Sequence, residues 1–117
     1  MKPIEIYSDK FLNSISWFMR VGGISLFPFI ILRENKKGTA RGKVLVNHET
    51  IHFWQTLELF IIGFYILYIF FYIKNLFVYK DLMVAYREIP FEAEAYHKEK
   101  DFNYIKKRKA YAWLWYV

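Results

Sequence analysis

Three residues in the stretch VLVNHETIHFWQ have types and spacing that suit a shared metal ion. His48 and His52 lie four residues apart, and Glu49 directly follows the first histidine. In a helix, residues four apart share one face, so both imidazole nitrogens can reach one ion. Glu49 reaches that ion less easily, so it is free to accept a proton from a water molecule that the metal activates. The spacing therefore predicts two metal ligands and a catalytic base.

A third ligand is expected from the acidic stretch that follows Pro90. Proline at the first helical position and acidic residues in the first turn predict a helix over residues 90–109. Glu92 is the predicted ligand because the first turn can face the histidine helix, while Glu94 and His97 could replace or supplement it. The chain has no cysteine, so any metal is held by nitrogen and oxygen. Such a set suits zinc, which is the expected cofactor, and also other divalent ions.

These two motifs resemble those of the glutamate zincins, in which HExxH on one helix is completed by a glutamate from a second helix. HETIH matches the first motif, and EAEA, which begins at Glu92, matches the E-x-x-A element. Within that group the sequence is most similar to membrane-integral enzymes such as the CAAX-prenyl proteases and the membrane heat-shock proteases. The resemblance implies zinc held by His48, His52 and Glu92, with Glu49 as the base, and hydrolysis of a peptide or protein substrate.

One position departs from the zincin pattern. Tyr96 stands where these enzymes usually have an aspartate that orients a ligand histidine, so another residue must take that role. Tyr96 and Arg87 are the candidates for stabilising an oxyanion. Gln55, one turn beyond His52 on the same face, could bond the site, but a helix-surface position is the expected one, and His97 is expected to be a surface histidine.

A second resemblance covers most of the chain from residue 44 onward. NHETIH followed by glutamine, together with YREIPFEAEAY, is similar to a set of small bacterial membrane proteins. This implies a bacterial membrane location, and we expect the inner membrane with the site on its cytoplasmic side.

Composition also favours a membrane. The 117 residues are 56% hydrophobic and 22% aromatic, which predicts a single membrane-associated domain, residues 1–117. The net charge of +6 would suit nucleic acid or anionic lipid. Lipid is favoured because the basic residues 106–109 lead into the aromatic tail AYAWLWYV. No nucleic-acid-binding motif is present, so membrane lipid is the expected partner.

The pattern of apolar residues predicts a mainly α fold. We expect a helix over residues 9–20, an extended segment over 24–33 that could form a short strand or hairpin within 24–46, and an unbroken helix over 44–73. The second half of that helix is an apolar run of 15 residues, short of the roughly 20 that cross a bilayer. An amphipathic returning helix is expected over 76–87.

A shared ion would require the chain to turn back after this apolar run. A lone crossing helix would put Glu92 on the opposite side of the membrane from His52, so residues 74–91 must fold back along the helix. The metal site thus predicts a helical hairpin in one leaflet. The competing prediction is a non-enzymatic membrane protein that packs against other membrane protein subunits, with a structural metal or none.

Overall fold

The computed structural model describes residues 2–15 and 22–117, which form a mainly helical fold with one small sheet, as predicted. The helix expected over 9–20 begins as a helix at Asp9, and its residues 16–20 lie outside the described part. In chain order the elements are β1 (Ile4–Tyr7), α1 (Asp9–Ile15), β2 (Gly23–Leu26), β3 (Phe29–Leu32), η1 (Glu34–Lys36), α2 (Ala40–Glu58), α3 (Ile62–Tyr79), α4 (Leu82–Arg87), α5 (Pro90–Lys98), α6 (Tyr104–Lys107) and η2 (Ala112–Tyr116).

The sheet has β3 in its centre, parallel to β1 and antiparallel to β2. The hairpin expected within residues 24–46 is therefore present as β2 and β3. Ile30 and Leu32 of β3 are fully buried, so this strand holds the sheet against the helices. β1 was not predicted, because its sequence IEIY is only four residues long.

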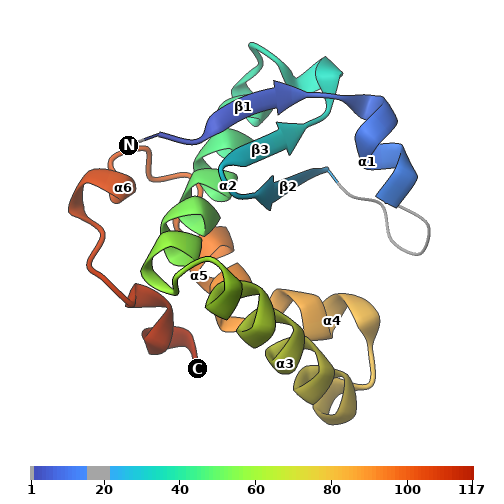
Figure 1. The fold of residues 1–117 in the computed structure, drawn as a ribbon, viewed down its shortest axis with the longest axis vertical. Helices are drawn as coiled ribbons and strands as arrows, with labels where there is room; N and C mark the ends of the chain where they lie inside the picture. Colours follow the sequence, from blue (N-terminus) through green and yellow to red (C-terminus); the bar gives the residue numbers. More distant parts are fainter. Residues whose placement is uncertain (1, 16–21) are drawn as a thin grey trace.

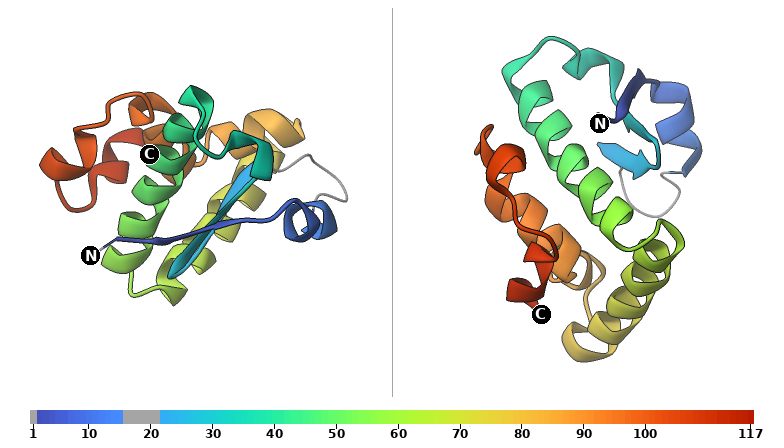
Figure 2. Two further views of the ribbon diagram at one scale, coloured as in Figure 1. Left: turned by 90° about the horizontal axis from the view of Figure 1, so that it is seen from above. Right: turned by 60° about the vertical axis from the view of Figure 1, so that its left-hand side comes forward.

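α2 is the central element, with the sheet along one side of it and α5 along the other (Figures 1 and 2). Thr39 caps its first turn by accepting a hydrogen bond from the backbone N–H of Gly42. A side chain at Gly42 would collide with the carbonyl oxygen of Lys36, so this position requires glycine. The helix begins four residues earlier than the predicted start at Val44.

The predicted unbroken helix over residues 44–73 is wrong, because the chain leaves the helical path between α2 and α3. Phe60 adopts a left-handed conformation with φ 56°. Its N–H donates to the carbonyl oxygen of Leu57, and the N–H of Ile61 donates to that of Thr56. This pair of bonds is the Schellman motif, which ends a helix and usually has glycine in the left-handed position. With phenylalanine there, the sequence carried no signal for the break.

α3 and α4 form an antiparallel pair, so the chain folds back after the apolar run (Figure 1). The returning helix predicted over 76–87 is wrong in its bounds, because α3 continues to Tyr79 and α4 covers only Leu82–Arg87. Lys80 in a left-handed conformation ends α3, and the side chain of Asp81 caps α4. The Asn75 amide then joins the two helices by donating to the carbonyl oxygen of Ala85. Among the described residues, α3 is the one helix long and apolar enough to cross a membrane. Whether this pair lies in a membrane stays a prediction.

α5 begins at Pro90, as predicted, but ends at Lys98 instead of continuing to residue 109. The reason is a contact from α2. The Asn47 amide donates to the carbonyl oxygens of Glu99 and Asp101, at 2.7 and 3.1 Å, so these carbonyls do not continue the helix. The chain then wraps around the outside of α2 and returns to α5 through η2 (Figure 2).

An aromatic core holds α3, α5 and η2 together. Phe91 of α5 packs against Phe64 and Phe71 of α3 and against Trp113 of η2, with ring centroids 4.8 to 5.9 Å apart. Because Phe91 precedes Glu92 directly, this packing fixes where the predicted third ligand emerges. The core therefore sets the position of the site.

Candidate metal centre

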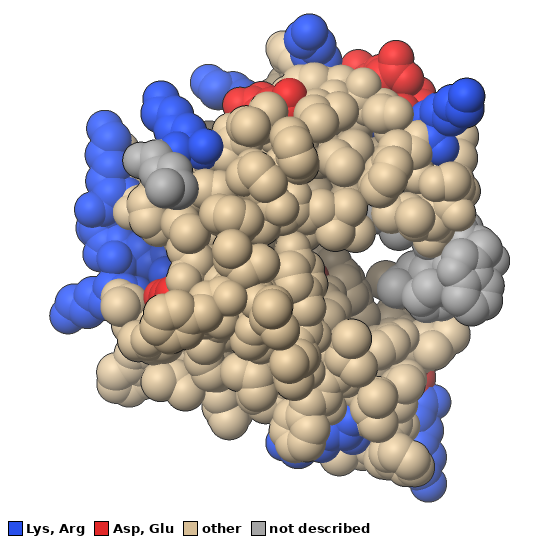
Figure 3. Space-filling view, in the orientation of Figure 1, with Lys and Arg blue, Asp and Glu red and all other residues tan. Residues whose placement is uncertain are grey.

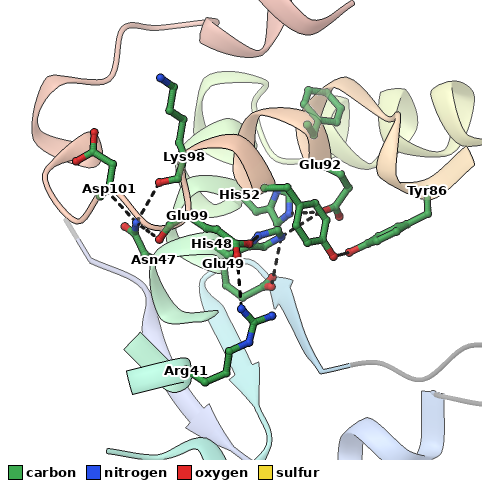
Figure 4. Close-up of polar contacts among 12 residues, drawn as sticks. Arg41, Asn47, His48, Glu49, His52, Tyr86, Glu92, Lys98, Glu99 and Asp101 are labelled. Carbon is green, nitrogen blue, oxygen red and sulfur yellow. Dashed lines mark hydrogen bonds and ion pairs between the residues drawn. The ribbon is translucent and has the colours of Figure 1, made fainter. Parts of the chain in front are cut away.

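The structure brings together the three residues that were predicted as metal ligands. The Nε2 atoms of His48 and His52 each lie 3.0 Å from Oε1 of Glu92 (Figure 4). All three side chains are buried, and their potential ligand atoms lie within 4.8 Å of one another. The two histidines project from adjacent turns of α2, and Glu92 faces them from the first turn of α5.

The hydrogen-bond network assigns the tautomer of His52 through Gln55. The Gln55 Nε2 group donates to the carbonyl oxygen of Phe91 and to a carboxylate oxygen of Glu94, at 3.1 and 2.9 Å. Its Oε1 must then be the atom that faces His52 Nδ1 at 2.7 Å. An amide oxygen only accepts hydrogen bonds, so Nδ1 carries the proton. The Nε2 of neutral His52 is left with a free lone pair, directed toward Glu92.

His48 has the same arrangement with a different partner. Its Nδ1–H donates to Oε1 of the Glu99 carboxylate at 2.9 Å, and Arg41 lies 3.5 Å from the other carboxylate oxygen. Glu99, and not a residue at position 96, is thus the carboxylate that orients the His48 ring. The ring of Tyr96 instead packs edge-on against His48, with centroids 4.6 Å apart.

This set of donors fits a metal ion. In the neutral state, both Nε2 lone pairs point at a carboxylate oxygen, an arrangement that repels unless a cation or protons lie between them. Two imidazole nitrogens and one carboxylate are also the protein ligands of a common class of catalytic zinc sites. Partners that orient the far nitrogen of each imidazole are a usual feature of such sites. The residues present therefore suit zinc.

The pKa values of His48, His52 and Glu92 are shifted in the directions that favour positive charge beside the Glu92 carboxylate. Burial lowers the pKa of His48, but hydrogen bonds to Glu92 and Glu99 raise it by more, to about 10. Burial also works against protonated His52, yet the charge of Glu92 gives it a raised pKa. For Glu92, burial raises the pKa, but His52 and His48 together hold it well below its usual range. The raised pKa values of both histidines and the lowered pKa of Glu92 thus have one cause, the close approach of two imidazoles to one carboxylate.

Glu49, the predicted base, is buried beside the ligands. One of its carboxylate oxygens lies 4.0 Å from Nε2 of His48. A Cβ added to Gly23 of β2 would lie 3.6 Å from the same oxygen, so the strand passes close to the carboxylate. Burial raises the pKa of Glu49 and outweighs the opposing charges of His48 and His52. It is therefore a stronger base than an exposed glutamate.

Several tyrosines lie around the cluster. Tyr68 of α3 donates to the second oxygen of Glu92 at 2.6 Å, which the sequence did not indicate. The hydroxyls of Tyr86 and Tyr96 lie 3.0 Å apart, and the Arg87 guanidinium stacks over the Tyr96 ring at 4.3 Å. Figure 4 shows Tyr86 extending toward this side of the cluster. Of the two oxyanion candidates, Tyr96 thus lies against His48, and Arg87 contacts Tyr96.

The two alternative ligands are engaged elsewhere. Glu94 is fully buried, but it accepts hydrogen bonds from Gln55, Tyr104 and Arg108. His97 is exposed, as expected, and its nearest polar partner is Tyr116. The prediction that Gln55 lies on the surface is wrong, since the side chain is fully buried between α2 and α5. Its position one turn beyond His52 was the available signal.

Comparison with known proteins adds no relative. No family model, no curated protein and no solved structure matches the chain.

Proposed function

We propose that this chain is a small membrane-associated zinc metalloprotease. The observation that carries the proposal is the buried group of His48, His52 and Glu92. Gln55 and Glu99 bond the Nδ1 atoms of the two imidazoles, so both Nε2 lone pairs face the Glu92 carboxylate, where one ion could bind. Zinc bound there would polarise a peptide carbonyl and lower the pKa of a water molecule.

In this proposal Glu49 carries the proton. Its carboxylate takes a proton from the attacking water and then passes it to the leaving amine, so the glutamate ends in its starting state. Its carboxylate oxygen lies 4.0 Å from the Nε2 ligand atom of His48, a position that suits this role. Tyr86, Tyr96 and Arg87 supply hydroxyl and cationic groups on the His48 side for the developing oxyanion.

A peptide substrate is supported by the sheet. Within the described residues β2 pairs with β3 on one side only, so it is an edge strand, and its first residue, Gly23, lies beside Glu49. An extended peptide could add to such an edge through main-chain hydrogen bonds. A peptide paired with β2 would then have its backbone near Glu49, the proposed base.

The alternative is a non-enzymatic membrane protein with a structural metal. Such a site would be closed by a fourth protein ligand. Glu94 and His97, the two candidates for that role, are hydrogen-bonded elsewhere or exposed. This favours the enzyme over the structural site.

The test is the metal content of detergent-purified protein by elemental mass spectrometry, combined with cleavage of a fluorogenic peptide library. We expect about one zinc per chain, lost in His48→Ala and Glu92→Ala but retained in Glu49→Gln. Glu49→Gln should lower cleavage on the order of a thousandfold. A native chain without zinc after purification with zinc would overturn the metal site. Equal cleavage by the native chain and Glu49→Gln, or none by either, would leave a structural metal.

A further inference from the structure

α3 exposes an apolar face that the rest of the described chain does not cover. We call this face the α3 stripe, which consists of Ile62, Ile66, Ile69, Phe70, Ile73 and Phe77. These residues follow each other at helical spacing, so they form one continuous line along α3. The two ends are the most exposed, Ile62 at 70% and Phe77 at 78%. Such a continuous apolar line on a surface marks a binding face.

The opposite face of α3 is already used. Phe64 and Phe71 pack on Phe91, Tyr68 bonds Glu92, and Asn75 bonds α4. The two faces are half a turn apart, so the stripe points directly away from the metal cluster. Whatever covers the stripe therefore does so without touching the ligands.

Charge indicates what covers it. Figure 3 shows a broad uncharged surface over the lower half of the molecule, with lysines and arginines at its margins. Lys74 and Lys80 are exposed near one end of α3, and Lys106, Lys107 and Lys109 are exposed at the end of α6 and just after it. Four glutamates but only two arginines have buried side chains in the described part, so the surface is more basic than the net charge of +6. An apolar face with a basic margin is complementary to an anionic lipid leaflet.

The position of α4 decides how the helix lies in that leaflet. α3 is about 27 Å long and could cross the hydrocarbon layer by length alone. However, Arg87 and Glu88 are exposed. The chain on both sides of them is bonded to the middle of α3, through the hydrogen bond from Asn75 to Ala85 and the one from Tyr68 to Glu92. A crossing α3 would hold both charges at the centre of the bilayer, where charged side chains are costly.

We propose that α3 lies in the plane of one anionic leaflet, with the α3 stripe inserted and the metal cluster on the water side. This inference rests on the membrane association in the proposed function, but not on bound zinc. In this orientation α3 attaches the protein to one side of the membrane without crossing it. Substrates would then be peptides presented at the membrane surface.

Spin labels test the orientation, since the chain has no cysteine and single ones can be introduced freely. Ile62→Cys, Ile69→Cys and Phe77→Cys are labelled, together with Arg87→Cys as a control, and bound to vesicles of phosphatidylcholine and phosphatidylserine. We expect the three stripe labels at equal depth, protected from a water-soluble nickel chelate, and the Arg87 label accessible to it. A label at Ile69 much deeper than those at both ends would show a crossing helix and overturn the proposal. Three water-accessible labels would overturn lipid docking itself.

Vesicle sedimentation tests the surface independently. Ile66→Asn combined with Ile73→Asn should weaken binding at least about tenfold, because two apolar side chains lose their burial. Ile4→Asn combined with Phe29→Asn is the matched control on the sheet, where the side chains are exposed to a similar degree, and should bind like the native chain. Equal binding by both pairs would contradict the proposal. Zinc content, measured on the same samples, separates a lost metal site from lost lipid binding.

Discussion

At the scale of single residues, the site depends on side chains that never reach the metal position. Gln55 holds His52 and Glu99 holds His48, each by a bond to Nδ1. Gln55 is held in turn by Phe91 O and by Glu94, so its orientation is determined by α5. The histidines supply the nitrogens, and their neighbours decide which nitrogen is available.

Replacing Gln55 should therefore weaken the metal site without removing a ligand. In Gln55→Leu, Nδ1 of His52 loses its acceptor, so the ring is free to take the other tautomer or to rotate. We expect zinc affinity to fall about 10- to 100-fold, measured by competition with a chromophoric chelator.

Asn75→Leu is the matched control for Gln55→Leu. It also removes a buried amide hydrogen bond, from Asn75 to Ala85, but it lies on the α3 face next to α4. This variant should lose stability and keep native zinc affinity. The same affinity loss in both variants would show that Gln55 acts only through stability.

At the scale of elements, the break between α2 and α3 is the feature that lets the site form. It turns α3 away from the axis of α2, and α4 and α5 then return along α3 to bring Glu92 to the histidines (Figure 1). At the break Phe60 adopts a left-handed conformation, and its side chain is 85% exposed. A residue other than glycine is strained there.

Glycine at this position should stabilise the fold. Phe60→Gly removes the backbone strain and loses little buried surface, so we expect the free energy of unfolding to rise by about 1 kcal/mol. Phe77→Gly is the control, because Phe77 is similarly exposed but lies within a regular helix, where glycine should cost about 1 kcal/mol. Both values come from denaturant titration in detergent. Destabilisation by both substitutions would argue against the left-handed turn.

At the scale of the whole molecule, one arginine joins the C-terminal segment to both helices of the site. Arg108 donates to Glu94 of α5 at 2.6 Å and to Glu58 of α2 at 2.8 Å, and its side chain is 6% exposed. Burial would raise the pKa of Glu94, but hydrogen bonds from Arg108, Tyr104 and Gln55 hold it below its usual range. A chain of contacts thus runs from Glu58 through Arg108, Glu94 and Gln55 to His52.

Loss of this arginine should be costly. Arg108→Ala leaves the buried carboxylate of Glu94 without its cation, and we expect the free energy of unfolding to fall by about 3 to 5 kcal/mol. Lys107→Ala removes the neighbouring cation, whose ion pair with Asp101 is exposed, and should leave stability nearly unchanged. Comparable losses for the two variants, measured by thermal unfolding, would contradict a buried network.

The local pattern alone indicated much of the site. His48 and His52 share a helix face because helical periodicity puts residues four apart one turn apart, and Pro90 marked the start of the helix that carries Glu92. The strand pair within residues 24–46 followed from the apolar residues of that segment. These features depend on neighbours in the chain, so the sequence determined them.

Contacts between distant segments decided the rest. The break at Phe60 has no glycine to reveal it, and α5 ends early where Asn47 of α2 bonds the carbonyl oxygens of Glu99 and Asp101, just beyond the helix. The orienting role of Glu99, and the burial of Gln55 between α2 and α5, exist only once those helices pack together. Hydrogen bonds between residues more than 35 positions apart leave no periodic trace in a sequence, so only the tertiary structure could place them.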